Sequence, residues 1–178
     1  LLCTLGAASV KELCYFTGAS MPTIKSLEKS GILTLEEREV FRRLPAIQVE
    51  PAPPLVLNRE QQEAFEGLDQ LRRSGQPAAA LLYGVTGSGK TQIYIRLIQE
   101  TRKQGKTALV LVPEIVLTPQ LLRIFTSHFG DQIAVLHSSL RAGERYDEWK
   151  RVREGTAAVV IGTRSAVFAP LDNIGVII

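Results

Sequence analysis

A glycine-rich segment near the middle of the chain, residues 84–91, restricts the possible folds more than any other feature. It reads Gly-Val-Thr-Gly-Ser-Gly-Lys-Thr and fits the spacing G-x-x-x-x-G-K-[ST]. An apolar run at residues 79–83 precedes it, and residues 92–101 follow with helical periodicity. This order predicts a strand, a tight turn and a helix, in which backbone amides and the helix N-terminus surround phosphate oxygens.

The segment predicts a nucleotide site made of Gly84, Val85, Thr86, Gly87, Ser88, Gly89, Lys90 and Thr91. We expect Lys90 to reach the β- and γ-phosphates, and Thr91 to ligate the Mg²⁺ that accompanies a nucleotide. The alternative interpretation is an ordinary glycine-rich turn between a strand and a helix. The segment indicates a nucleoside triphosphate but not a reaction, so kinases, GTPases, transporters and motor proteins all remain open.

Beyond residue 57, short apolar runs alternate with amphipathic stretches. Helices are predicted at residues 59–74, 91–103, 119–129 and 143–153, and strands at residues 79–83, 107–112, 133–136, 157–161 and 174–178. Such alternation predicts an α/β domain whose parallel sheet carries helices on both faces.

The first part of the chain has a different pattern. Residues 1–44 read as helix, tight turn, helix and short hairpin, which is the order of a small winged helix-turn-helix domain truncated at its start. Residues 45–56 contain four prolines and are interpreted as a semi-rigid linker. We therefore place the second domain at residues 57–178.

Lys25 and Lys29 share one face of the second helix of this first domain, which would be its recognition helix. They are candidate DNA contacts, but residues 1–44 carry six basic and five acidic residues, a weak electrostatic footprint for a DNA-binding domain. Protein docking or simple spacing is the alternative role.

Composition excludes some classes of protein. Aromatic residues make up 6% of the chain, which argues against a large platform for base stacking, and the net charge of +3 permits a polyanionic partner without requiring one. No apolar run approaches the roughly 18 residues of a membrane span. The two cysteines, Cys3 and Cys14, lack metal-ligand spacing and are interpreted as free thiols, so we expect a cytoplasmic protein.

Several further segments form an ordered set. They are LNREQ at residues 57–61, LVPEIVLTPQ at residues 111–120, HSSL at residues 137–140, GERYDEW at residues 143–149 and IGTRSAVFAP at residues 161–170. The set resembles the first motor lobe of superfamily 2 DNA helicases, and among them the bacterial replication-restart helicases. The resemblance implies a RecA-like P-loop NTPase lobe, incomplete here, behind a winged helix.

The same resemblance implies roles for individual residues. Gln61 corresponds to a glutamine that reads the adenine edge, because its amide both donates and accepts; a solvated helix-start residue is the alternative. The resemblance implies DNA-backbone contacts, which suit these side chains, for Thr118, Gln120, Thr163 and Arg164. Thr118 also suits helix capping, and Arg164 also suits a structural ion pair.

The implied parent is an ATP-dependent 3′–5′ DNA helicase that restarts replication at stalled forks through primosome assembly. ATP, Mg²⁺, branched and single-stranded DNA, single-strand-binding protein and primosome proteins would be its ligands and partners, without a membrane. An acidic Asp-Glu pair, a second lobe and zinc-binding cysteines are expected outside this chain, so we expect the fragment alone to be inactive. Another superfamily 2 translocase, or a non-catalytic nucleotide-sensing winged-helix regulator, remains the alternative.

Overall fold

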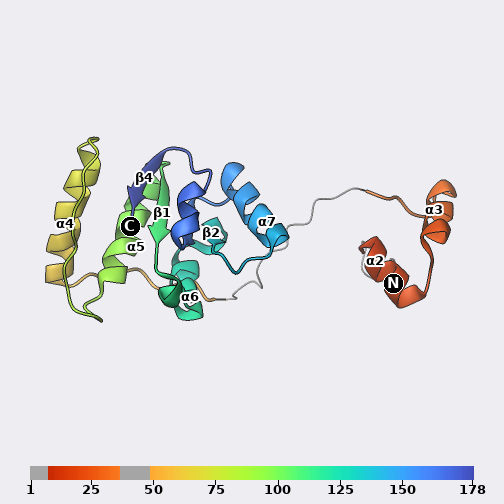
Figure 1. Cartoon of the computed structure of the whole chain (residues 1–178), viewed down its shortest axis with the longest axis horizontal. Helices are drawn as coiled ribbons and strands as arrows, with labels where there is room; N and C mark the ends of the chain where they lie inside the picture. The colour runs from red at the N-terminus through yellow and green to blue at the C-terminus, as the bar shows by residue number, and fades with distance from the viewer. Residues whose placement is uncertain (1–7, 37–48) are drawn as a thin grey trace. The chain divides into compact units, whose positions relative to one another are not determined.

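The computed structural model describes residues 8–36 and 49–178. The chain divides into two compact units, Leu1–Val40 and Phe41–Ile178. Figure 1 shows the helices of the small unit and the sheet with its helices in the large unit. Within the described residues, no helix combines the length and the hydropathy needed to cross a bilayer.

The small unit contains two short helices, α2 (Val10–Thr17) and α3 (Met21–Lys29). Ile24 of α3 is fully buried. Helix α3 is followed by Gly31 at a φ of +71°, a left-handed conformation that glycine adopts without strain. No strand is formed by residues 32–36, and the other half of the expected hairpin lies outside the described residues. The winged helix and the domain limits therefore stay predictions.

The large unit is built on a parallel sheet. Its strands are β1 (Thr107–Leu111), β2 (Ile133–Leu136), β3 (Val159–Gly162) and β4 (Ile174–Ile177). Their order is β2-β3-β1-β4, and every neighbouring pair is parallel. β1 and β3 pair without a register break, with Val110 opposite Ile161. The predicted α/β class with a parallel sheet is confirmed.

Helices cover both faces of this sheet. They are α4 (Arg59–Arg73), α5 (Lys90–Lys103), α6 (Pro119–Phe129) and α7 (Ala142–Arg153), with 3-10 turns η1 (Glu114–Val116), η2 (Gly130–Gln132) and η3 (Arg164–Phe168). Alternate residues of the strands enter two separate cores. One core contains Ile95 and Ile98 of α5 with Phe125 of α6, whereas the other contains Val152 of α7.

Helix α4 lies on the side of α5 that faces away from the sheet (Figure 1). The two helices pack through Phe65 of α4 and Ile93 and Leu97 of α5, all of which are buried. Helix α5 is therefore buried on two sides, since its other face contributes to the sheet core. The N-terminus of a helix held in this way is a fixed point for the loop that precedes it.

The predicted strand at residues 79–83 is wrong for this structure. These residues form no regular element, and Leu81 and Tyr83 are 88% and 91% exposed. A groove of about 730 Å³ is lined by residues of this segment and by residues 174–178 of the β4 region. A strand needs a neighbour for its backbone hydrogen bonds, and β4 does not pair with this segment. Residues 79–83 are apolar as predicted, but an apolar sequence does not by itself provide a neighbouring strand.

Candidate functional site

The glycine-rich loop leads directly into α5. Gly87 and Gly89 have φ values of +84° and +85°, and Gly89 occupies the N-cap position of the helix. A side chain at position 89 would be strained by this φ, and its Cβ would lie 2.2 Å from the Nε2 atom of Gln61. The glycines are therefore required by the loop's shape, which brings backbone amides to the start of a well-anchored helix.

Lys90, the first residue of α5, folds back over the loop. Its ammonium donates hydrogen bonds to the carbonyl oxygens of Gly84 at 2.7 Å and Val85 at 2.8 Å. These two carbonyl oxygens hold the Lys90 ammonium at the mouth of the loop. The oxygens of a phosphate group could replace them as acceptors. Thr91 follows in the first turn of the helix, half-buried, and its hydroxyl makes no hydrogen bond to another described residue. The residues present fit a nucleotide phosphate with its Mg²⁺.

Gln61 connects α4 to this loop. The side-chain oxygen of Gln61 accepts a hydrogen bond from the Asn58 backbone amide at 3.0 Å. In return, the backbone amide of Gln61 donates to the side-chain oxygen of Asn58 at 2.9 Å. Its Nε2 donates to the carbonyl oxygen of Ser88 at 3.1 Å. Gln61 therefore lies beside the predicted phosphate site, where it serves both as a helix cap and as a tie to the loop. Its reading of adenine stays a prediction.

The candidate DNA contacts follow the carboxyl ends of two adjacent strands. Thr118 caps α6 by accepting from the Leu121 amide at 3.2 Å, and both Thr118 and Gln120 are exposed. The second segment follows β3, and the amide of Val112 after β1 donates to the carbonyl of Gly162 in β3 at 2.9 Å. Thr118 therefore caps α6, which was the alternative role for this residue, and its side chain remains at the surface.

Thr163 and Arg164 differ sharply in accessibility. Thr163 is 4% exposed, whereas Arg164 is exposed at the start of η3. Among residues 8–36 and 49–178, no carboxylate lies within ion-pairing distance of the Arg164 guanidinium. The structural ion pair considered for Arg164 is thus not formed within that part of the chain, and its charge faces solvent.

Lys25 and Lys29 lie one turn apart on α3, and both are exposed. They belong to the small unit and are not placed relative to the residues above. Their role as DNA contacts stays a prediction.

Two residues that sequence reasoning did not single out join the loops of this edge. The Ser138 hydroxyl, in the loop after β2, donates to the Glu114 carboxylate at 2.6 Å. Arg145 of α7 donates to the carbonyl oxygens of Ser138 and Leu140, both at 3.2 Å. These residues lie in segments that marked the resemblance, but nothing in their spacing indicated that they would meet.

A metal centre finds no support in the part of the chain that the structure describes. It contains no group of three or more histidine, cysteine, aspartate or glutamate side chains arranged to hold an ion. Burial lowers the pKa of the His128 imidazole from its ordinary value, so this residue is neutral near pH 7 at the end of α6.

The sequence of this chain is similar to those of known proteins. Residues 54–178 match the family described as "Type III restriction enzyme, res subunit". The replication restart protein PriA of Bacillus subtilis (strain 168) is 45% identical over 94% of this chain and 21% of that protein. Replication restart protein PriA of Haemophilus influenzae is 52% identical over 70% of the chain and 17% of that protein.

A solved structure agrees with the fold. RecG bound to a three-way DNA junction superposes with a TM-score of 0.62 and 27% identity, over 70% of this chain and 18% of that one. The chain spans about a fifth of the length of the curated relatives it matches. It resembles one segment of the replication restart proteins, and by the match over residues 54–178 it belongs to the Type III restriction enzyme, res subunit, family.

Proposed function

We propose that this chain is the nucleotide-binding part of an ATP-dependent 3′–5′ DNA helicase that restarts replication at stalled or repaired forks. The observation that carries the proposal is the glycine loop, with Lys90 held at its mouth and α5 anchored behind it. The similarity to PriA proteins at 45% and 52% identity supports replication restart as the process. The cytoplasm is the compartment in which such a protein acts.

The residues present divide the work of holding a nucleotide. Lys90 exchanges its two carbonyl acceptors for β- and γ-phosphate oxygens, and the Thr91 hydroxyl is available to the accompanying Mg²⁺. Gln61 exchanges its bond to the Ser88 carbonyl for the adenine edge, since its amide both donates and accepts. Bound ATP supplies the phosphoryl group whose hydrolysis drives movement.

The exposed residues in the loops after β1 and β3 bind the DNA. Arg164 neutralises a phosphate, and Gln120 and Thr118 donate to the backbone beside it. The RecG complex with a three-way junction supports branched DNA as the substrate class. Single-strand-binding protein and primosome proteins are the partners we propose for the longer protein, whose zinc-binding cysteines would lie outside this chain.

DNA-stimulated ATP hydrolysis tests the proposal. A longer protein that contains this chain should hydrolyse ATP faster with single-stranded DNA and unwind a duplex from a 3′ tail. A nucleotide-sensing regulator would bind ATP without this stimulation, so unstimulated turnover rules the helicase out. A duplex with a 5′ tail serves as the polarity control.

The RecG similarity and the family description favour one second candidate, a superfamily 2 translocase that moves on duplex DNA without restarting replication. The two candidates differ in substrate. A restart helicase should prefer forks with a single-stranded tail, whereas a duplex translocase should be stimulated equally by unbranched duplex DNA.

A further inference from the structure

The short turn η3 carries an exposed aromatic ring beside the exposed arginine described above. In the described part of the large unit, the exposed tyrosine and phenylalanine side chains are those of Tyr83, Tyr146 and Phe168, and Phe168 is 82% exposed. Phe168 ends η3, whereas Arg164 begins it. A single exposed apolar side chain is ordinary on a protein surface, so exposure alone does not mark a site. What marks one here is the way in which η3 holds the ring next to a cation.

The three faces of η3 explain why the ring and the cation both point away from the core. A 3-10 helix has about three residues per turn, so side chains three positions apart share a face. Ala166 is fully buried, and the other four residues of η3 are exposed. One solvent face therefore carries Arg164, and the next carries Phe168. At about 2 Å per residue, the two ends of η3 are about 8 Å apart along its axis, so both side chains can contact one ligand.

The backbone of η3 is anchored on both sides of Phe168. Ala166 belongs to the core beneath α7, and Leu171 packs against the same core. The Ala169 amide donates to the Ala166 carbonyl at 3.0 Å. A Cβ added to Gly162, the last residue of β3, would lie 2.6 Å from the Cβ of Ala166, so the turn packs closely over the end of the strand. An anchored backbone therefore presents the Phe168 ring, and little ordering remains to be done when a ligand binds.

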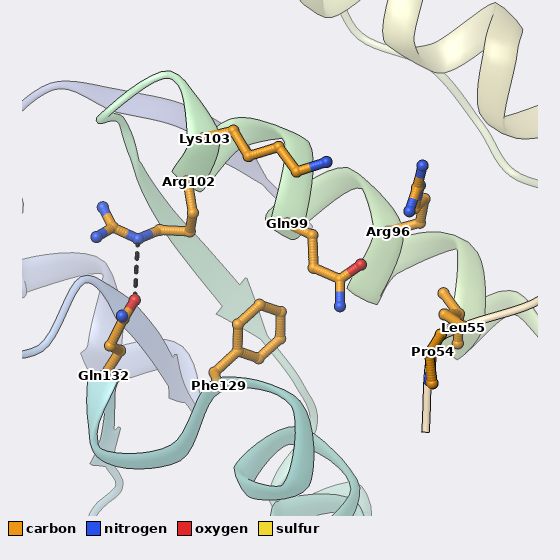
Figure 2. A pocket seen from close by; sticks show the side chains of 8 residues that line it. All are labelled: Pro54, Leu55, Arg96, Gln99, Arg102, Lys103, Phe129 and Gln132. Carbon is orange, nitrogen blue, oxygen red and sulfur yellow. Dashed lines mark hydrogen bonds between the residues drawn. The ribbon is translucent and has the colours of Figure 1, made fainter. Parts of the chain in front are cut away.

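Another aromatic ring near cations lies in a hollow of the large unit, and it differs from Phe168 in its packing. Figure 2 shows this hollow between α5, the end of α6 and the segment before α4, with Lys103 and Phe129 among its lining residues. The half-buried Phe129 ring stacks on the buried Phe125, with centroids 6.3 Å apart, so it is part of the protein's own packing. No ring or arginine of the described residues packs on Phe168, whose faces stay free for a ligand.

A DNA strand fits the surface of η3 better than a protein does. Among residues 8–36 and 49–178, no carboxylate lies within ion-pairing distance of Arg164, so its ligand has to bring the anion. Every nucleotide brings a phosphate together with a flat ring, whereas a protein has to place the two separately. In addition, η3 follows the carboxyl end of β3, and open α/β sheets bind their ligands at the carboxyl ends of the strands.

Base stacking is the contact that an exposed ring beside a phosphate-binding cation can make. Aromatic side chains stack on single-stranded bases with little regard to sequence, because every base has a π-face. We propose that Phe168 stacks on a base of the single strand whose phosphate Arg164 neutralises, an inference that deepens the function proposed above and rests on it. The bases of a duplex are already stacked on one another, so only a single strand offers a free face to the ring. Phe168 therefore makes this edge of the sheet selective for single-stranded DNA.

Fluorescence anisotropy with two labelled oligomers of equal length tests the proposal on a longer protein that contains this chain. One oligomer is oligothymidylate, and the other has the same sugar-phosphate backbone with a stable abasic residue at every position. Phe168→Ala should weaken oligothymidylate binding about tenfold and leave the binding of the abasic oligomer unchanged. The slope of log affinity against log salt should not change in Phe168→Ala, because no phosphate contact is lost, whereas Arg164→Ala should lower it on both oligomers.

Further substitutions separate stacking from a general apolar contact. Phe168→Trp should keep the affinity for oligothymidylate, whereas Phe168→Leu, which is apolar but has no π-face, should lose nearly as much as Phe168→Ala. Val167→Ala is the matched control, since Val167 is an exposed apolar neighbour on the same turn. Circular dichroism and ATP-analogue binding verify that each variant is folded.

Three outcomes would contradict the stacking contact. Full oligothymidylate affinity in Phe168→Leu, or an equal loss on both oligomers in Phe168→Ala, overturns it and indicates that a protein surface covers the ring. Unchanged oligothymidylate affinity in Phe168→Ala overturns the stacking alone and leaves the proposed helicase function standing. Failure of the unchanged protein to bind either oligomer overturns that function together with the stacking.

Discussion

Two regions of the large unit differ in how they are prepared for the ligands that we propose. In the proposed nucleotide half, Lys90 and Gln61 already bond to carbonyl oxygens of the glycine loop. In the proposed DNA half, Gln120 and Arg164 are exposed and make no hydrogen bond or ion pair to another described residue.

The difference has a physical consequence. A nucleotide must replace internal hydrogen bonds, so its binding free energy is the difference between two sets of bonds. A DNA phosphate meets a solvated cation and gains mainly by releasing counterions. Substitutions in the nucleotide half should therefore alter selectivity and turnover, whereas substitutions in the DNA half should alter the salt dependence of binding.

Lys90→Ala should have the largest effect. Removing the ammonium at the loop's mouth should lower ATP turnover of a longer protein that contains this chain by about 10²–10³-fold, because transition-state charge loses a placed cation. DNA binding without nucleotide should be unchanged. Steady-state ATPase assays check this, with Lys150→Ala of α7 as the matched control. Turnover at the unchanged level in Lys90→Ala would remove the loop from the mechanism.

Gln61→Ala should come next. The change removes the tie to Ser88 and the predicted adenine contact, so the preference for ATP over GTP should fall by about two- to tenfold. Competition binding of the two nucleotides measures the ratio. Gln62→Ala is the matched control, since the side chain of Gln62 bonds to Glu66 on its own helix and not to the glycine loop. If the ratio stays constant in Gln61→Ala, this residue ties the loop without reading the base.

Arg164→Ala should act on DNA alone. If the guanidinium neutralises one phosphate, the slope of log affinity against log salt should fall by about one unit, or slightly less for single strands. ATP affinity without DNA should not change. A salt titration of oligonucleotide binding shows the slope, and Arg153→Ala provides an exposed arginine for comparison. An unaltered slope for Arg164→Ala would break the comparison between the two halves.

Ser138→Ala should have the smallest effect. It removes the bond to Glu114, which joins the loop after β2 to the turn before Thr118. Because the pair is exposed, we expect DNA affinity to fall only about two- to threefold. The neighbouring Ser139→Ala should leave the affinity unchanged. A larger loss for Ser138→Ala, measured by the same titration, would mean that this edge also depends on internal bonds.

Local patterns were enough to predict most elements of the large unit. Helix α6 and strand β2 begin and end at the predicted residues, and α5 and β1 differ by one residue. The signals that predicted these elements are local. They are the helical periodicity, the capping residue Thr118 and the glycines that follow helices, and none of them depends on a distant segment of the chain. The glycine loop is local for the same reason, since its eight residues contain both its turn and its cation.

What the sequence could not determine is how distant segments pair. The apolar run at residues 79–83 predicted a strand, but a strand requires a neighbour, and in the described part of the chain β4 pairs with β1 and not with this run. The bonds from Gln61 to Ser88 and from Ser138 to Glu114 join residues 27 and 24 positions apart, and no local pattern encodes such meetings. The sequence by itself determined most elements of the large unit and the glycine loop that begins α5. The tertiary structure decided which loops share an edge, because hydrogen bonds and burial between segments depend on the whole sheet.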